Sequence, residues 1–141
     1  MNFFQSLFCN QYAEIKARGG DVTKAQLNTI LLSTVLITLY IVIIFMLYGR
    51  LNPGFLERSF STSNLSGRTV GRLLAAIVGL MVFILMRRAI GSKAWYDKTV
   101  NEFERMRPEE QKETTKKGIR YFMLVSLPVA VFILWALISV F

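Results

Sequence analysis

The sequence predicts an all-α integral membrane protein with three transmembrane helices, a preceding amphipathic helix, an inner N-terminus and an outer C-terminus. Its 141 residues are 53% hydrophobic. They include two uncharged apolar runs of 21 residues each, 28–48 and 121–141, and a shorter run, 73–86. A helix needs about 20 residues to cross a hydrocarbon core of about 30 Å, so the first and last runs qualify directly.

We expect one membrane domain over 1–141. Its expected segments are an interfacial helix (1–19), a first span (24–48), an outer loop (49–65), a second span (66–87), an inner basic helical connection (88–118) and a third span (119–141). Of the 17 basic residues, three precede the first run, ten separate the second and third runs, and four separate the first and second. The positive-inside rule therefore places the N-terminus and 87–120 on the inner side of the membrane.

The first segment has the pattern of an amphipathic helix. Its large apolar side chains recur on one side of a helical wheel, and they include Phe3, Phe4, Leu7 and Phe8. Gly19 and Gly20 are expected to end this helix. The apolar face is expected either to lie in the membrane interface or to pack on a partner subunit. The start lacks the basic region and cleavage site of a signal peptide, so we expect it in the mature protein.

The first span is expected to begin near Thr23, because Thr23 and Gln26 have the spacing of a capping box. The third span contains Pro128, which lacks a backbone N–H and therefore frees the carbonyl of Leu124. We expect a kink there, with the Ser126 hydroxyl compensating part of the lost hydrogen bonding. The polar connection before this span is expected to turn near Arg107-Pro108.

The second span is predicted to start before its apolar run, with Ser63, Asn64 or Ser66 as the N-cap. A helix over 67–86 rises about 30 Å, which is enough to span. Small residues four apart form one narrow face of this helix: Gly67, Gly71, Ala75 and Gly79. Such a face lets two helices approach closely within lipid. It is expected to pack either on another span of this chain or on a partner.

Four arginines flank the second span and are expected to contact lipid headgroups: Arg68 and Arg72 at the outer side, Arg87 and Arg88 at the inner side. The ten basic and six acidic groups of 87–120 give this connection a net charge of +4. Anionic phospholipids are expected partners for it. The pattern does not resemble a nucleic-acid-binding motif, and no nucleic acid is expected.

The chain offers little for catalysis. It has no histidine and one cysteine, Cys9, which we expect either to pack as a small apolar residue or, with less weight, to be palmitoylated. All nine acidic residues lie outside the apolar runs, whereas pumps and coupled transporters use charges within the membrane. We therefore expect no catalytic, metal or cofactor site and no enzyme activity. The outline is similar to that of small three-helix diacylglycerol kinases, but no carboxylate cluster here matches their motif.

These patterns favour a non-catalytic accessory subunit of a larger inner-membrane complex, which packs on other integral membrane proteins and contacts lipid. The alternative is a self-assembling pore or holin-like protein, for which only the hydroxyls of the first span offer a polar lining: Thr29, Ser33, Thr34 and Thr38. A lipid or quinone enzyme completed by partner residues is the third hypothesis. The membrane is expected to be a bacterial inner membrane or an organelle's inner membrane, with 87–120 on the cytoplasmic or matrix side.

Overall fold

The computed structural model describes residues 1–52, 54–55 and 67–140, and in this part the chain is helical. Its five helices are α1 (Phe3–Ala17), α2 (Lys24–Leu51), α4 (Gly67–Ile90), α5 (Lys93–Glu104) and α6 (Pro108–Val140). Three segments are long and apolar enough to cross a membrane: Lys24–Leu51, Thr69–Ile90 and Pro108–Ser139. This confirms the three predicted spans and indicates an integral membrane protein.

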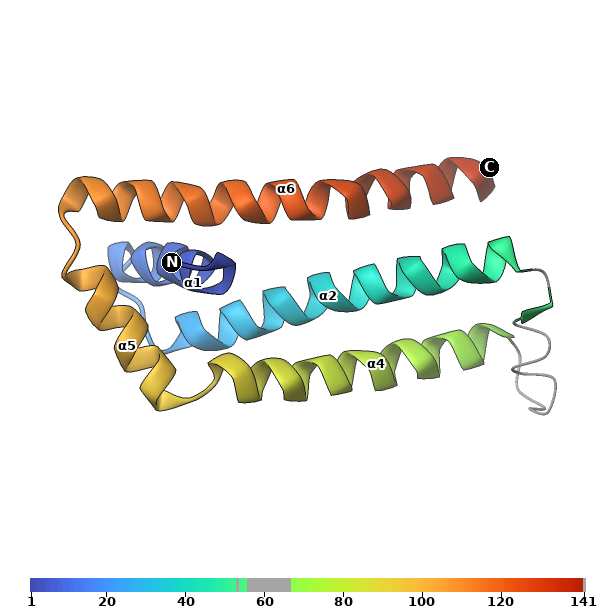
Figure 1. The fold of residues 1–141 in the computed structure, drawn as a ribbon, viewed down its shortest axis with the longest axis horizontal. Helices are drawn as coiled ribbons and strands as arrows, with labels where there is room; N and C mark the ends of the chain where they lie inside the picture. Colours follow the sequence, from blue (N-terminus) through green and yellow to red (C-terminus); the bar gives the residue numbers. More distant parts are fainter. Residues whose placement is uncertain (53, 56–66, 141) are drawn as a thin grey trace.

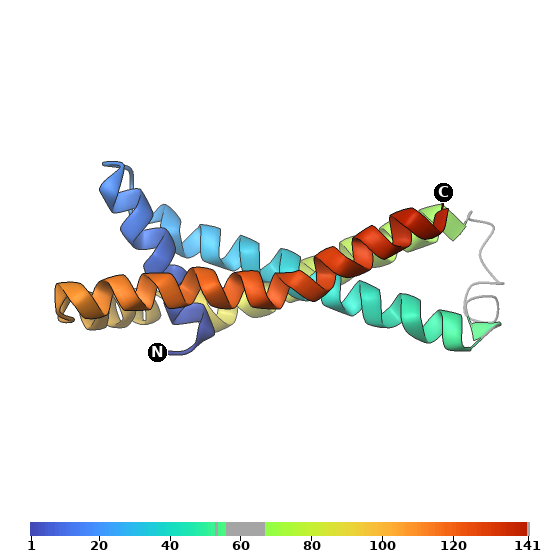
Figure 2. The ribbon, with the colours of Figure 1, turned by 90° about the horizontal axis from the view of Figure 1, so that it is seen from above.

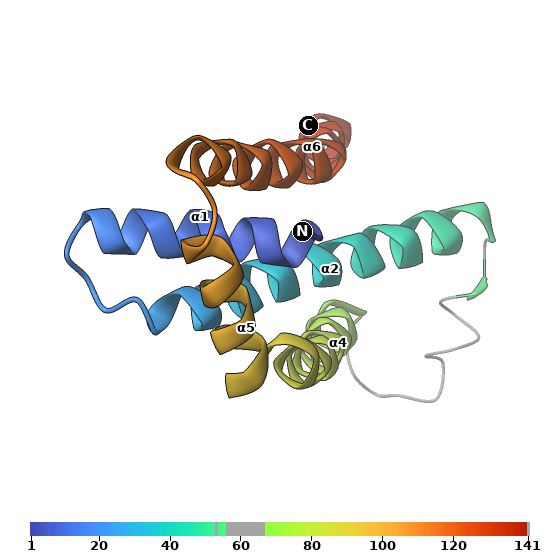
Figure 3. The same ribbon diagram turned by 60° about the vertical axis from the view of Figure 1, so that its left-hand side comes forward.

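The three long helices lie in the order α4, α2, α6, and α1 lies between α2 and α6 at one end (Figure 1). Seen from above, α6 crosses over α2, and α1 runs obliquely beneath the first half of α6 (Figure 2). α5 runs across the same end and joins α4 to α6 (Figure 3). We call this end, formed by 1–24 and 87–120, the basic end. One cluster of buried apolar residues lies at this end and includes Ala25 at the start of α2, and a second lies between α2 and α4 and extends from Ile90 into the spans.

α1 has a well-defined start and stop. Asn2 and Gln5 form a reciprocal capping box, in which each side-chain oxygen accepts a hydrogen bond from the other residue's backbone N–H, at 2.9 and 3.0 Å. The helix ends at Ala17, and Gly19 follows with φ +67°. That backbone conformation suits glycine, so the predicted stop is confirmed.

The start of α2 differs from the prediction. The helix begins at Lys24, but the Thr23 side chain makes no capping hydrogen bond to it. Instead, Asp21 Oδ1 accepts hydrogen bonds from the Thr23 hydroxyl at 2.6 Å and from the Thr23 backbone N–H at 3.0 Å. The predicted capping box is therefore wrong, because the carboxylate two residues earlier binds the threonine in a local turn.

α4 begins at Gly67, so residues 67–72 continue the second span as helix, as predicted. The expected N-caps Ser63, Asn64 and Ser66 lie outside the described residues. α4 ends at Ile90, and Ser92 starts α5 by accepting a hydrogen bond on its Oγ from the N–H of Trp95 at 3.2 Å. The sequence pattern had predicted a helical connection here and not the break between α4 and α5 at Gly91 and Ser92.

The predicted turn before Pro108 is confirmed, because α5 ends at Glu104 and α6 begins at Pro108.

α6 continues as one helix through Pro128, and it bends near its middle (Figure 2). The Ser126 hydroxyl donates to the carbonyl of Met123 at 3.1 Å rather than to that of Leu124, so its predicted compensating role is wrong. Nearby, the Tyr40 hydroxyl of α2 donates to the carbonyl of Val125, the residue after Leu124, and so links α2 to α6 beside the proline.

α1 and α6 approach each other closely at Gly118. A Cβ added to Gly118 would lie 2.8 Å from the backbone carbon of Ser6 and 3.2 Å from the nitrogen of Leu7, and nearer still to the Ser6 oxygen. Further along the same contact, the Asn10 side-chain amide donates to the carbonyl of Thr115 at 3.4 Å. Only a residue without a side chain fits at position 118, because the opposing atoms are backbone.

Gly118→Ala is expected to loosen α1 from α6. Overpacking against a rigid backbone costs about 1–3 kcal/mol, which outweighs the gain of about 0.5–1 kcal/mol that alanine brings inside a helix. The single cysteine, Cys9, lies on the buried face of α1, so its exposure reports the release of this helix. The rate of Cys9 modification by a maleimide should rise by roughly 10-fold or more.

Gly71→Ala is the matched control, because Gly71 is also helical but an added Cβ there would meet nothing within 4 Å. It should leave Cys9 protected. Equal labelling rates for Gly118→Ala and the wild type would contradict the close contact between α1 and α6.

Candidate functional site

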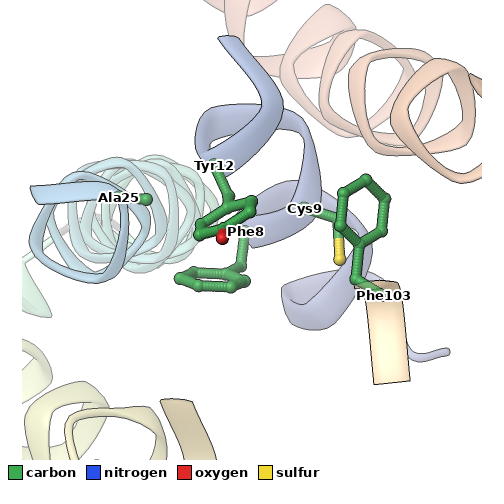
Figure 4. Packing of buried hydrophobic residues seen from close by; sticks show 5 residues of the cluster. All are labelled: Phe8, Cys9, Tyr12, Ala25 and Phe103. Carbon is green, nitrogen blue, oxygen red and sulfur yellow. The ribbon is translucent and has the colours of Figure 1, made fainter. Parts of the chain in front are cut away.

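The basic end is held together by the apolar face of α1. Phe8, Cys9 and Tyr12 from α1 form a cluster with Ala25 of α2 and Phe103 of α5. Phe8 and Tyr12 lie close together, and Cys9 points toward Phe103 (Figure 4). The cluster therefore holds α1 against both the start of α2 and the distant helix α5.

Aromatic contacts extend this cluster onto α5. The Phe8 ring lies edge-on to the rings of Trp95 and Tyr96, with centroids 5.3 and 5.5 Å apart. Tyr12 meets Phe103 in the same geometry, at 6.1 Å. Edge-to-face aromatic pairs contribute about 0.5–1.5 kcal/mol each beyond the area they bury. α5 is therefore fixed against α1 as well as through its links to α4 and α6.

The four residues predicted to contact the membrane interface differ in how far they are buried. Leu7 and Phe8 are 2% and 0% exposed, so they contact other helices of this chain, which neither reading of the apolar face anticipated. Phe3 and Phe4 are partly buried, and Phe4 packs against the cluster formed by α2 and α4. The amphipathic pattern was recognisable in the sequence, but the surface that covers it combines the start of α2 with α5, whose residues lie more than 80 positions away.

A polar contact lies at the edge of the α1 cluster. The Tyr12 hydroxyl donates to Glu104 Oε1 at 2.8 Å, and Lys16 Nζ lies 3.1 Å from the same oxygen. The hydrogen bond from Tyr12, and next the one from Lys16, lower the pKa of Glu104. Desolvation by burial, followed by the hydrogen bond to Glu104, raises the pKa of Tyr12 to about 12. The contact therefore favours an ionised carboxylate beside a neutral phenol.

Cys9 is placed as a packing residue. Its side chain is fully buried, and burial raises the pKa of its thiol to about 12. A thiol that is buried and protonated is a poor nucleophile. This placement supports the packing interpretation over palmitoylation.

α2 and α4 pack through a second apolar cluster, formed by Ile30, Val82, Met86 and Ile90. Gln26 strengthens the same junction: its side-chain amide donates to the carbonyl of Ile90 at 2.7 Å and to that of Ser92 at 3.1 Å. These carbonyls lie where α4 ends, and backbone groups at helix ends need such partners. No local sequence pattern predicts this cap, because Gln26 and Ile90 are 64 residues apart.

The predicted small-residue face is split between two environments. A Cβ added to Gly79 would lie 3.8 Å from the Thr38 methyl group, so Gly79 packs on α2 of the same chain. An added Cβ at Gly71 would meet no atom of the described residues within 4 Å, so within them this part of the face is open. Ala75 lies between them and is partly buried, and nothing further is described around Gly67. Packing within the chain, one of the two predicted alternatives, is therefore found at Gly79, and packing on a partner stays a prediction for the rest of the face.

The hydroxyls of the first span lie inside the bundle. Ser33 and Thr34 are only 1% and 8% exposed, and Thr29 donates to the carbonyl of Ala25 one turn earlier. The hydroxyl oxygens of Ser33, Thr34 and Thr38 are buried without a hydrogen-bond partner among the described residues. They are thus not on the surface that a second copy would meet.

The predicted headgroup arginines are found at both ends of α4. Arg72 is exposed near its start, and Arg87 and Arg88 are exposed in its last turn, whereas the side chain of Arg68 lies outside the described part. One arginine that sequence reasoning did not single out has a defined contact: the Arg50 guanidinium lies over the Trp135 ring, 4.8 Å from its centroid. This cation–π contact links α2 to α6 away from the basic end.

Tyr12→Phe is expected to weaken the docking of α1 by about 1 kcal/mol, because the mutation removes one hydrogen bond to a charged group at a partly exposed site. In the wild type, ionised Glu104 stabilises the folded chain. This contribution to the free energy of unfolding is fully present above the ordinary carboxyl pKa of 4.5 and is lost as the pH falls through the lowered pKa of Glu104. The contribution of the neutral Tyr12 phenol to the free energy of unfolding is fully present below its ordinary pKa of 10.0 and is lost as the pH rises toward its raised pKa of about 12. Thermal unfolding in detergent across this pH range measures the loss of stability at acidic pH (the acidic limb) and the loss at alkaline pH (the alkaline limb).

The phenylalanine variant should lose the part of the alkaline limb that comes from Tyr12. A conservative Lys24→Gln substitution, at an exposed position outside this contact, is the control and should leave both limbs in place. An unchanged alkaline limb in Tyr12→Phe would contradict the assigned role of the Tyr12–Glu104 bond.

No group of three or more histidine, cysteine, aspartate or glutamate side chains is placed to hold a metal ion within the residues that the structure describes. Comparison with protein-family models, with curated proteins and with solved structures finds no match to this chain. What can be inferred about its function therefore comes from its packing surfaces and its charge distribution.

Proposed function

We propose that the chain is a non-catalytic accessory subunit of a larger inner-membrane complex. In this proposal it packs on other integral membrane proteins through the open part of α4 and contacts anionic phospholipid at its basic end. The single observation that carries the proposal is the open small-residue surface at Gly71.

The spans are only loosely packed on one another. Of the most apolar window of each candidate span, 22% is buried in α2, 11% in α4 and 6% in α6. Most of the surface of α4 and α6 is thus available to lipid or to other helices. Among the described residues, one buried apolar cluster is centred on α1 at the basic end, and a second lies where α2 packs on α4.

Glycine at an open helix surface favours a helix partner over lipid. Water exclusion does not drive helices together within a bilayer, so association depends on close packing and interhelical contacts. Gly71 allows a close approach, and the neighbouring Ala75 is small as well. Gly79 already has its neighbour in Thr38, so it belongs to the chain's own packing.

The pore alternative has less support. A pore needs a polar lining, and the hydroxyls that were candidates for it face the interior of this chain. The side chains that the spans expose are mostly large and apolar, among them Ile44, Leu80 and Leu134. A bilayer accommodates such a surface without a water-filled channel.

The proposed orientation places the basic end inside and the opposite end outside. The ten basic residues of 87–120 and the three of the N-terminal segment gather at the same end of the fold, and basic residues are enriched on the inner side. Reporter fusions in bacteria test this: green fluorescent protein at the N-terminus should fluoresce, and alkaline phosphatase after residue 141 should be active. The reverse pattern would overturn the orientation.

Gly71→Leu is expected to release the partner proteins from the tagged chain extracted in a mild detergent. The leucine occupies the space into which a partner helix would pack, and a loss of about 1–2 kcal/mol corresponds to roughly 10-fold weaker association. Native-gel mass and mass spectrometry of the co-purified proteins measure the change.

Ala76→Leu is the matched control, because it adds similar bulk at an exposed position outside the stripe of residues four apart. It should retain the partners. A wild-type chain that purifies alone, or as a ladder of its own copies, would contradict the accessory-subunit proposal.

A further inference from the structure

We propose that the corner between α4 and α5 binds the phosphate group and one acyl chain of an anionic phospholipid. A groove of about 500 Å³ lies at this corner and is lined by Phe83, Ile84, Arg87, Arg88, Gly91 and Ser92. The inference deepens the lipid-contact part of the proposed function and rests on it. It is more specific than a general attraction of basic residues to membranes, because it assigns one site.

The groove changes from apolar to cationic along α4. Phe83 and Ile84 belong to the apolar run of the second candidate span, and Arg87 and Arg88 follow them in the last turn of the same helix. Gly91 and Ser92 then form the break before α5. A phospholipid has the same order, with a hydrocarbon chain in the membrane and a phosphate at its surface, so the groove matches both parts of this ligand.

The two arginines are free to bind an anion. Neither Arg87 nor Arg88 takes part in an ion pair within the described residues, and both side chains are exposed. A guanidinium group binds phosphate oxygens through two parallel hydrogen bonds, and such charge-assisted bonds are about twice as strong as neutral ones. The nearest acidic residue along the chain is Asp97, a full turn inside α5.

The backbone of the corner is held in place from the other side. The Gln26 amide of α2 donates to the carbonyls of both Ile90 and Ser92, and the Ser92 hydroxyl caps α5. Ser92 thus lines the groove and also starts α5, so the α5 N-terminus, with its partial positive charge, begins at the edge of the groove. A fixed corner reduces the cost of ordering the site when a ligand binds.

The test is native mass spectrometry of the purified chain in detergent, titrated separately with phosphatidylglycerol, phosphatidylcholine and inorganic phosphate. The wild type should bind one phosphatidylglycerol in preference to phosphatidylcholine, and inorganic phosphate should not displace it. Arg87→Ala/Arg88→Ala should weaken phosphatidylglycerol binding by about 30-fold, the factor expected for two basic groups at a lipid surface.

Arg105→Ala/Arg107→Ala is the matched control. It removes the same charge from exposed arginines at the turn between α5 and α6, outside the groove. It should change phosphatidylglycerol binding by less than about two-fold, since only nonspecific attraction is reduced. Protection of Cys9 from maleimide shows whether either variant still folds.

Three results would overturn the site: equal losses in the two double variants, equal binding of the two lipids by the wild type, and displacement by inorganic phosphate. The last result would assign the corner to a soluble phosphate compound. The Arg87→Ala/Arg88→Ala variant should keep its protein partners, whereas Gly71→Leu should keep its lipid. Failure of the lipid site and failure of the accessory-subunit proposal are thus distinguished.

Discussion

The fold depends on the insertion of α1 between α2 and α6. At Gly118 the backbone of α6 approaches that of α1 so closely that no side chain fits between them. This approach allows Phe8 and Cys9 to be buried between α1, α2 and α5. Without α1, α2 and α6 would meet mainly at their crossing, where the Tyr40 hydroxyl binds a carbonyl beside Pro128, and at the Arg50–Trp135 contact.

This arrangement gives the chain two dissimilar ends. The basic end combines apolar packing with defined polar contacts, such as Tyr12–Glu104 and the Gln26 cap of α4. Toward the other end the spans are held by few contacts, and Gly71 faces open space. An accessory subunit needs both properties, because a fixed part keeps the helices together while an exposed part is available to partners and lipid.

The sequence was sufficient to predict features that depend on local patterns. The three spans follow from uncharged runs, the stop of α1 from Gly19, and the start of α6 from Pro108. Features that depend on contacts between residues far apart in the sequence could not be predicted from local patterns. Gly118 resembles any helical glycine until Ser6 is placed beside it, and the small-residue face gives no sign that Gly79 meets Thr38 while Gly71 meets nothing. At Thr23 a local competitor, Asp21, changed the expected cap.

The most direct test of the α1 insertion is a cross-link between α1 and α6 in lipid bilayers. Asn10→Cys and Thr115→Cys, combined with Cys9→Ser, place two thiols where the Asn10 amide binds the Thr115 carbonyl. A short bifunctional maleimide should join them within one chain, whereas Asn10→Cys paired with Ser139→Cys, at the far end of α6, should stay unlinked. Absence of the first cross-link, with both cysteines reactive toward a monofunctional maleimide, would show that α1 lies elsewhere and contradict this account.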